Sequence, residues 1–180
     1  MSILKKLNTG SGTPDNALQM FDSLEPVEVA FMLGNWKGEG FHTNHPMDGR
    51  LEAYHWYGKR FDSVEDAHPL VFSKLSSGFA YVNPAFMGPW LGLIHRAPRP
   101  KSAAIGRLFQ LVMPLFTTSK SRARLRMTSY RGKSSATMIY DQLPINDVFR
   151  LIDENAVFGL MDLKGMERPF FFILRRERGG

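Results

Sequence analysis

The chain has 180 residues, and its 43% of hydrophobic and 22% of charged residues are typical of one folded, soluble domain rather than of a disordered chain. It contains no cysteine, which excludes disulfides, thiolate metal sites, iron–sulfur clusters and cysteine catalysis. It has no apolar N-terminal signal segment, and its longest nearly apolar run, residues 105–116, is too short to span a bilayer; we therefore expect a cytoplasmic protein that is not integral to a membrane.

The N-terminal part is predicted to be a flexible leader followed by helices. Residues 1–12 show no apolar periodicity, which is typical of a mobile chain end. Thr13 and Pro14 supply a capping hydroxyl and a proline at the first helical position, so a helix is expected to begin there. A second short helix begins around Pro26 and ends at Gly34. We expect these helical segments to form a lid on the domain that follows.

The rest of the chain shows many short segments of strand pattern separated by Gly, Pro and Asn turns. Residues 103–116 are the exception, because their pattern fits either one helix or an apolar loop ended by Pro114. Short strands at about ten-residue spacing favour a mainly β protein, a single antiparallel β-barrel over residues 13–180. After a first strand that follows Gly34, the predicted strands are 53–61, 70–73, 79–83, 90–95, 122–130, 135–141, 147–153, 156–162 and 169–177.

The first predicted strand opens with glycines around one tryptophan: Gly34, Trp36, Gly38 and Gly40. Glycine in a strand costs stability, so repeated glycines on the Trp36 face indicate that another segment crosses closely or that the strand bends sharply. Trp36 would then close one end of the barrel, with Arg175 or Arg176 over its ring. This arrangement is similar to that of lipocalins and related calycins. It gives these residues a structural role in barrel closure.

Over residues 31–90 the chain resembles a bacterial family named for its GXWXG domain. Over residues 135–178 it resembles the companion domain of unknown function that follows in that family. The resemblance implies a calycin-like barrel, similar to lipocalins and fatty-acid-binding proteins, and it implies no particular activity. The companion region carries the pattern Tyr140, Asp141, Pro144, Ile145, Asp147, Phe149, Arg150, Asp153, Gly159, Met161, Asp162, Lys164, Gly165 and Pro169 to Phe172.

The histidines bear on an alternative with haem. Nitrobindin-type haem barrels also open with a Gly-x-Trp-x-Gly run, and they bind haem through a histidine late in the chain. The five histidines here are His42, His45, His55, His68 and His95. Because none follows residue 95, the expected haem ligand is missing, and we predict no cofactor while keeping haem as the alternative. His42 and His45 lie close in sequence but lack a third ligand nearby, so no metal site is predicted.

The basic residues favour an anionic partner without identifying it, since the formal net charge is +6. Arg122, Arg124 and Arg126 alternate with apolar residues, which places the guanidinium groups on one face of a strand. A solvated face is the simplest interpretation, and contact with an anionic membrane surface is a further one. A specific nucleic-acid partner is not predicted, because the basic residues are not interleaved with a stacking motif.

The 14 Phe and 10 Met residues, the helical lid and the barrel motif together predict binding of a hydrophobic molecule inside the barrel, such as an acyl chain with an anionic head group. No catalysis is assigned. A buried arginine would hold the head group through a charge-assisted contact, and the candidates are Arg124, Arg126 and Arg150. The candidate aromatic ligand contacts are Tyr54, Trp56, Phe79, Tyr81, Trp90, Tyr140, Phe158, Phe170 and Phe172.

An enzyme built in the barrel cavity is a second alternative. Asp141, Asp147, Asp153 and Asp162 occur near predicted strand ends, where acids more often accept hydrogen bonds from turn N–H groups than catalyse reactions. No Ser-His-Asp order or helix-borne histidine pair is present. The sequence therefore predicts no catalytic residue, and it leaves the ligand's identity and the oligomeric state open.

Overall fold

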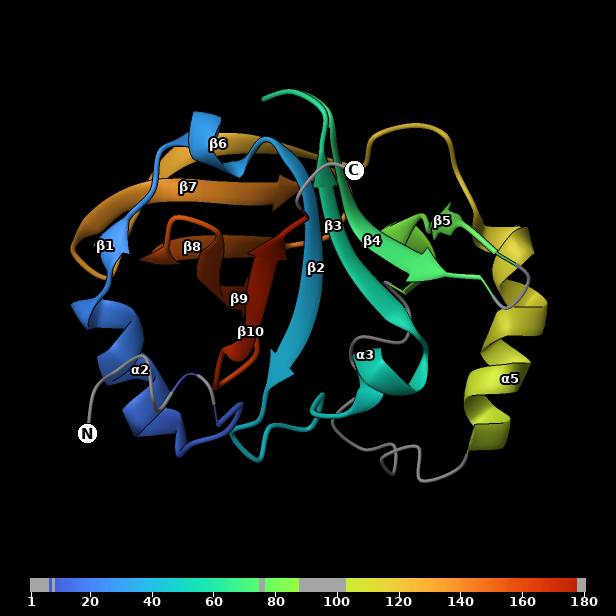
Figure 1. The fold of residues 1–180 in the computed structure, drawn as a ribbon, viewed down its shortest axis with the longest axis horizontal. Helices are drawn as coiled ribbons and strands as arrows, with labels where there is room; N and C mark the ends of the chain where they lie inside the picture. The colour runs from blue at the N-terminus through green and yellow to red at the C-terminus, as the bar shows by residue number, and fades with distance from the viewer. Residues whose placement is uncertain (1–6, 8, 75–76, 88–102, 178–180) are drawn as a thin grey trace.

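The structure, a computed structural model, describes residues 7, 9–74, 77–87 and 103–177. Its main element is a ten-stranded sheet in the order β1-β8-β7-β6-β4-β3-β2-β10-β9, with β5 paired to β4. β9 also pairs with β8, so the order returns on itself and the strands form a closed ring (Figure 1). The paired strands are antiparallel, which confirms the mainly β, antiparallel prediction.

The strand bounds lie close to those predicted for most of the chain. The predicted strand 53–61 begins only at Trp56, because Arg50–Ala53 forms helix α3. The predicted strand 90–95 lies outside the described residues. The strands are β1 Glu25–Pro26, β2 Gly34–Phe41, β3 Trp56–Phe61, β4 Ala67–Ser73, β5 Phe79–Tyr81, β6 Ala123–Tyr130, β7 Lys133–Tyr140, β8 Ile145–Asp153, β9 Ala156–Leu163 and β10 Phe170–Arg176.

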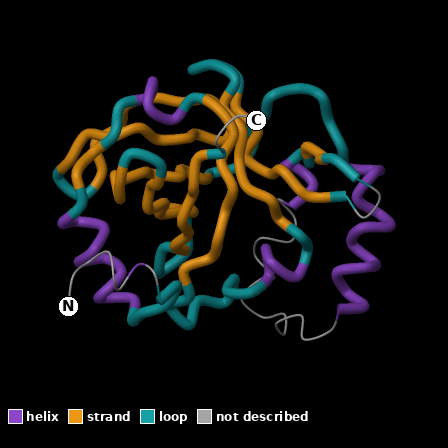
Figure 2. Tube along the Cα trace, in the orientation of Figure 1, coloured by secondary structure: helices purple, strands orange, loops and turns teal. Residues whose placement is uncertain are grey.

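The helices lie around the ring (Figure 2). α2 spans Pro14–Ser23, and the hydroxyl of Thr13 accepts a hydrogen bond from the Asn16 N–H at 3.2 Å, as its capping role predicts. The segment 103–116 is helical rather than a loop: α5 covers Ala103–Val112 and continues into the 3-10 turn η3, Met113–Phe116. The remaining 3-10 turns are η1 Val29–Met32 and η2 Pro84–Met87. Among the described residues, no helix is both long enough and apolar enough to cross a bilayer.

α2 packs against the outer face of the ring, not over its interior as the lid prediction expected. Phe21 of α2 lies in an apolar cluster with Phe41 of β2, Phe158 of β9 and Phe171 of β10. Leu7, inside the segment expected to be a flexible leader, is 2% exposed in the same cluster. α2 packs there because β2, β9 and β10 direct large apolar side chains to the outer face as well as to the interior. The apolar stripe of α2 is buried against these side chains.

A second and larger apolar cluster fills the inside of the ring, and Trp36 of β2 is fully buried in it. The indole N–H of Trp36 donates to the carbonyl of Met32 at 2.7 Å. The guanidinium carbon of Arg176 lies 4.3 Å from the Trp36 ring centre, and Arg176 also donates to the carbonyl of Leu33. Of the two arginines considered, the structure therefore places Arg176 over the ring, while Arg175 forms an ion pair with Glu39 at 3.5 Å.

The glycine motif accommodates a neighbouring side chain. A Cβ on Gly38 would lie 2.2 Å from the ring of Trp56, so the missing side chain leaves the space that Trp56 occupies. Gly34 has φ 112°, in the region that favours glycine, and the N–H of Gly40 donates to the carboxylate of Glu52 at 3.2 Å. The close crossing predicted for this strand is therefore made largely by Trp56.

A bulge in β3 determines which of its residues face inward. The β3–β4 register shifts on both sides of Gly58, where φ is 153° and a Cβ would lie only 1.9 Å from the carbonyl oxygen of Trp36. As a result Trp56, Lys59 and Phe61 all contribute to the inside of the ring. Strict alternation from Trp56 would have placed Lys59 outside.

Candidate functional site

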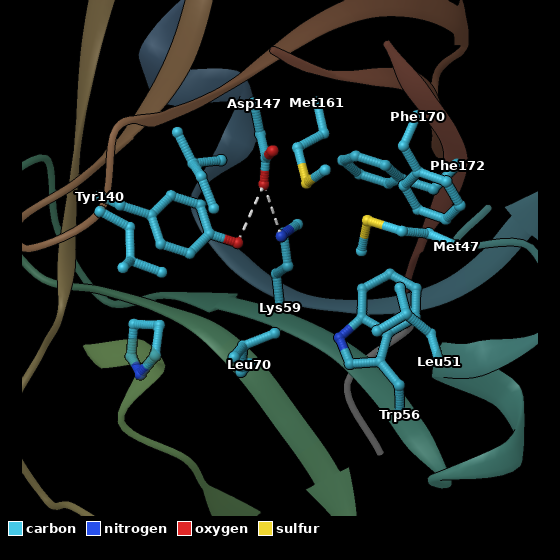
Figure 3. Close-up of a pocket in the computed structure, with 13 residues that line it drawn as sticks. Met47, Leu51, Trp56, Lys59, Leu70, Tyr140, Asp147, Met161, Phe170 and Phe172 are labelled. Carbon is cyan, nitrogen blue, oxygen red and sulfur yellow. Dashed lines mark hydrogen bonds and ion pairs between the residues drawn. The ribbon is translucent and has the colours of Figure 1, made fainter. Parts of the chain in front are cut away.

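A small cavity inside the ring is the candidate site (Figure 3). Its volume is about 40 Å³, well below the several hundred Å³ of an ordinary ligand pocket and enough for a few waters or a compact molecule. Most of the wall is apolar, and three charged or hydroxyl-bearing side chains interrupt it: Lys59, Asp147 and Tyr140. The wall is completed by Met47, Leu51, Trp56, Leu70, Pro84, Leu143, Ile145, Met161, Phe170 and Phe172.

Lys59 and Asp147 form a buried ion pair at the centre of the site. The Lys59 Nζ lies 2.7 Å from Asp147 Oδ2, and the side chains are 3% and 1% exposed. Lys59 also donates to the carbonyl of Pro69 at 3.2 Å. β3 supplies the lysine and β8 the aspartate. Such a pair costs desolvation energy and adds little net stability, so its presence in an otherwise apolar interior points to a role in binding or catalysis.

The same carboxylate oxygen receives a second hydrogen bond. The hydroxyl of Tyr140 in β7 donates to Asp147 Oδ2 at 3.4 Å. Burial raises the pKa of Asp147 above its ordinary value, and the ion pair with Lys59 and the Tyr140 hydrogen bond oppose this rise. Burial and the nearby Asp147 charge raise the pKa of Tyr140 well above its ordinary value. Tyr140 is therefore a neutral hydrogen-bond donor at physiological pH.

Two residues that line the cavity each carry a buried polar atom without a hydrogen-bond partner among the described residues. These atoms are the second carboxylate oxygen of Asp147, Oδ1, and the indole nitrogen of Trp56, Nε1. Figure 3 shows the nitrogen edge of Trp56 on the side of the ring nearer Lys59. An unpaired buried acceptor or donor costs about 1–3 kcal/mol, so a molecule that paired both would gain binding energy.

Aromatic rings surround the Lys59 ammonium group. Its Nζ lies 5.1 Å from the ring centre of Phe172, 5.7 Å from that of Trp56 and 5.8 Å from that of Tyr140. At these distances the faces of the rings stabilise the positive charge. The charge of Lys59 is thus compensated by Asp147 and by three rings, and it is not free for an anionic group.

Four of the nine predicted aromatic contacts line the cavity: Trp56, Tyr140, Phe170 and Phe172. Tyr54 packs at the margin of the inner cluster, with its ring centre 4.8 Å from that of Phe109 in α5. Trp90 lies outside the described residues. The structure thus gathers part of the predicted set around Lys59 and Asp147.

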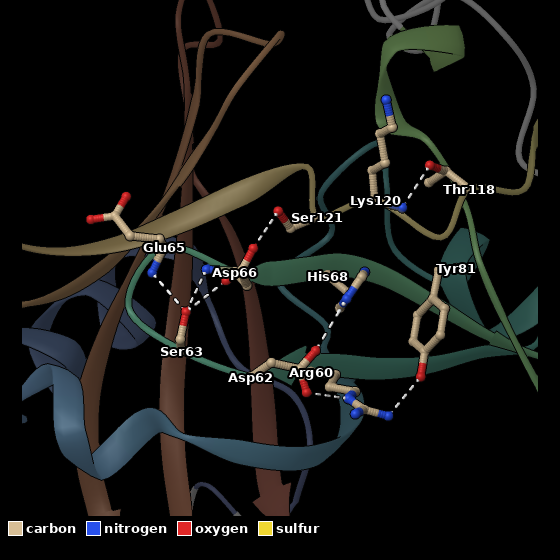
Figure 4. A network of polar contacts seen from close by, with 10 residues as sticks. All are labelled: Arg60, Asp62, Ser63, Glu65, Asp66, His68, Tyr81, Thr118, Lys120 and Ser121. Atoms are coloured by element: carbon tan, nitrogen blue, oxygen red, sulfur yellow. Dashed lines mark hydrogen bonds and ion pairs between the residues drawn. The ribbon is translucent and has the colours of Figure 1, made fainter.

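Three other predicted aromatics do not face the interior. Phe158 lies on the outer face beneath α2, because on β9 it alternates with the inward-facing Val157. Phe79 is 44% exposed, and Tyr81 accepts a hydrogen bond from Arg60 at 2.9 Å outside the ring (Figure 4). On β5 the inward residue is Ala80. The sequence had left open which face of each strand points inward, and the structure turns these three aromatics outward.

The three arginines considered for a head group also lie away from the cavity. Arg124 is exposed, and Arg126 forms an ion pair with Glu65 at 2.6 Å. Arg150 is fully buried but on the outer face, with its guanidinium carbon 4.8 Å from the ring centre of Phe21. Its guanidinium donates to the carbonyls of Tyr130, Lys133 and Phe149. Carbonyls and a ring, rather than an acidic ligand, therefore accommodate this buried charge.

None of the described histidines lines the cavity. His45 is buried, and its Nδ1 accepts a hydrogen bond from the N–H of Met47. His68 lies in the outer polar network of Figure 4, 3.2 Å from Asp62, and burial lowers its pKa. His42 faces Glu52 at 3.8 Å, and His55 has φ 62° at the start of β3. The described part of the chain holds no cluster of three or more His, Asp or Glu side chains suited to a metal ion.

Sequence reasoning missed Lys59 and gave Asp147 a different position. Asp147 was expected at the end of a strand, where it would accept hydrogen bonds from turn N–H groups, but it lies within β8 with its side chain directed inward. The available signal was its place between Ile145 and Phe149, two residues that also point into the inner cluster. For Lys59 no local signal existed, because the bulge at Gly58 sets its direction.

Comparison with known proteins establishes the family. Residues 19–76 match the GXWXG protein family, and residues 121–176 match a domain of unknown function, DUF4334. A solved structure of a protein from Thermomonospora curvata is 30% identical and has a TM-score of 0.72, with 99% of this chain and 100% of that chain covered. No curated protein matches the sequence. The chain belongs to the GXWXG family, which confirms the family resemblance described for residues 31–90 and 135–178. Both matched regions begin earlier than those ranges.

Proposed function

We propose that this protein binds a compact lipophilic molecule inside its ring of strands. In this proposal the ring is a calycin-like barrel, and its interior holds the ligand. The observation that carries the proposal is the pair of unpartnered atoms, Asp147 Oδ1 and Trp56 Nε1, on two residues that line one apolar cavity. Such cavities with a few convergent polar groups are the usual form of small-molecule sites.

The polar group of the ligand should be neutral and able both to donate and to accept. Asp147 Oδ1 requires a donor and Trp56 Nε1 requires an acceptor, and a hydroxyl group can serve either atom. A carboxylate is disfavoured, because Asp147 already neutralises Lys59 and would repel a second anion. The anionic head group expected from the sequence is thus replaced in the proposal by a hydroxyl-like group.

The apolar part of the ligand should be compact. A cavity of about 40 Å³ does not accommodate an extended acyl chain. Met47 and Met161 belong to its wall, and the flexible methionine side chain adapts readily to a guest of a different shape. A small ring or a short branched alcohol is therefore the class of ligand that suits the site, once Met47 and Met161 move aside to enlarge the cavity.

Ligand-observed NMR with cyclohexanol, cyclohexane and cyclohexanecarboxylate tests this proposal. Cyclohexanol should bind more tightly than the other two, and Trp56→Phe should weaken it by about tenfold, the value of one hydrogen bond in an apolar site. The matched control is Tyr81→Phe, which removes a polar aromatic group outside the ring and should leave binding unchanged. Tighter binding of the carboxylate, or equal effects of the two substitutions, would contradict the proposal.

The free oxygen of Asp147 also favours a second candidate function, proton transfer. The carboxylate would take a proton from the carbon beside a carbonyl while Trp56 donates to the carbonyl oxygen; the carboxyl proton would exchange with solvent, and in D₂O a deuteron would then be delivered to the carbon. Exchange of deuterium into butanone in D₂O, followed by NMR, tests this role. Wild-type protein should accelerate the exchange and Trp56→Phe should slow it; no acceleration by the wild type would exclude it.

A further inference from the structure

The α5–η3 segment exposes an unusual apolar surface. Leu108, Leu111 and Leu115 are 62%, 75% and 77% exposed, and their spacing places them on one side of the helical segment. Val112 adds to the same surface. Figures 1 and 2 show α5 at the margin of the molecule, on the side opposite α2. We call Leu108, Leu111, Val112 and Leu115 the leucine face. Exposed leucines in such a group mark an interaction surface.

The opposite side of the segment is fixed to the ring, so the leucine face has a defined direction. The side-chain amide of Gln110 donates to the carbonyls of Tyr54 at 3.2 Å and Ser73 at 3.1 Å. Phe109 packs on Phe72 with ring centres 5.1 Å apart, and Met113 is buried in the inner cluster. The helix therefore uses its other side for packing, and the leucine face is left for another contact.

The stretch of sequence that contains this segment is strongly basic. Between Asp66 and Asp141 the sequence contains no acidic residue, while it contains eleven Lys or Arg residues. Arg107 of α5 and Lys120 after η3 are exposed, and Lys74 is exposed beside residues 117–119 at the rim of a surface groove. None of these three takes part in an ion pair between described residues. They are available to an anionic surface.

We propose that the leucine face docks on an anionic lipid bilayer, with the leucines in the interface and Arg107, Lys120 and Lys74 near the head groups. An exposed apolar helical face bordered by basic residues is the pattern of helices that lie in the plane of a membrane. Each cation near such a surface adds to the attraction. The stretch between Asp66 and Asp141, which includes this segment, contributes no acidic side chain that would repel an anionic bilayer.

Docking there would bring the bilayer close to the candidate site. Gly106 of α5 packs on the backbone of Ala53 in α3, and the adjoining Leu51 of α3 lines the cavity. A lipophilic ligand could then pass from the membrane past α3. This link rests on the proposed function, whereas the docking itself depends only on the leucine face and its charges.

Vesicle flotation tests the docking. The full chain is mixed with vesicles of phosphatidylcholine alone or of phosphatidylcholine with phosphatidylserine, at low and at high salt. We expect binding to the phosphatidylserine vesicles that declines as salt rises. Leu111→Ser/Leu115→Ser should reduce binding by at least about tenfold, since each leucine transferred from water contributes about that factor. Arg107→Gln should weaken binding by a few-fold.

Matched controls use exposed residues elsewhere. Val64 and Met127 are 38% and 37% exposed, and Val64→Ser/Met127→Ser should leave flotation unchanged. Lys37→Gln, in β2, should have less effect than Arg107→Gln. No flotation of the wild type, equal binding to both vesicles, or equal effects of the two double substitutions would overturn the proposal. So would concentration-dependent dimerisation in sedimentation velocity that Leu111→Ser/Leu115→Ser abolishes, because the face would then be occupied by a second copy. Loss of cyclohexanol binding by itself would affect the proposed function and not the docking.

Discussion

The substitution Lys59→Met should destabilise the protein in a manner that depends on pH. Methionine keeps the length and apolar stem of lysine, but it leaves the carboxylate of Asp147 buried without a positive partner. At 2.7 Å the lost attraction is about 6 kcal/mol for an effective dielectric constant of about 20. The folded protein can avoid this cost by protonating Asp147, so the cost of protonation sets the upper limit.

That limit follows from the ordinary pKa of the carboxyl group, 3.8. Protonating such a group at pH 7 costs about 4 kcal/mol, because each pH unit above the pKa is worth about 1.4 kcal/mol. At pH 5 the cost is only about 1.5 kcal/mol. Burial raises the pKa of Asp147 in the folded state, and removing Lys59 raises it further. The folded variant therefore binds a proton that the unfolded chain lacks, so its stability falls as pH rises from 3.8 towards the folded pKa.

Urea unfolding followed by tryptophan fluorescence at pH 5, 6 and 7 measures this effect, with the wild type compared at each pH. The free energy of unfolding should drop by about 3–4 kcal/mol at pH 7 and by clearly less at pH 5. The control Lys59→Met/Asp147→Asn lacks the titrating carboxyl, so its difference from the wild type should not grow between pH 5 and pH 7. A pH-independent loss in the single variant would refute the buried ion pair as the cause.

Three further predictions concern the ring and its surroundings. Trp36→Ala should lower the free energy of unfolding by about 3–5 kcal/mol, since a fully buried aromatic is removed; an unchanged melting temperature would contradict the closure role of Trp36. Gly58→Ala should cost about 3 kcal/mol or more in urea unfolding, because its Cβ would meet a backbone oxygen at 1.9 Å. Gly132→Ala, also at positive φ but with nothing within 4 Å, should cost only about 1 kcal/mol; equal costs would argue against the tight bulge. Burial lowers the pKa of His68 in the folded protein below its ordinary value of 6.5. The folded state therefore favours the neutral imidazole, and the protein loses stability as the pH falls from 6.5 through the lower pKa. His68→Gln should therefore lose less stability than the wild type between pH 7 and pH 5 in thermal melts, and identical slopes would exclude this role.

The sequence by itself determined the features that depend on short stretches of chain. Most strands could be placed by alternation and turn residues, and the start of α2 by the capping residue Thr13 and by Pro14. The glycine motif around Trp36 predicted a close crossing, and its similarity to the lipocalin arrangement suggested Arg175 or Arg176 as the covering cation, of which the structure has Arg176. These features could be predicted because backbone preference and side-chain chemistry act over a few residues.

The direction of side chains within the strands was decided only in the tertiary structure. The bulge at Gly58 turns both Trp56 and Lys59 inward, although alternation separates them. The pairing of β8 with its neighbours brings Asp147 to Lys59 from a distant part of the sequence. Phe158 and Arg150 face outward, on the side of the ring that α2 covers. Successive side chains of a strand point to opposite faces of the sheet, so a register shift of one residue reverses the direction of every side chain that follows. The register is set by the partner strands, and no local sequence pattern identifies them.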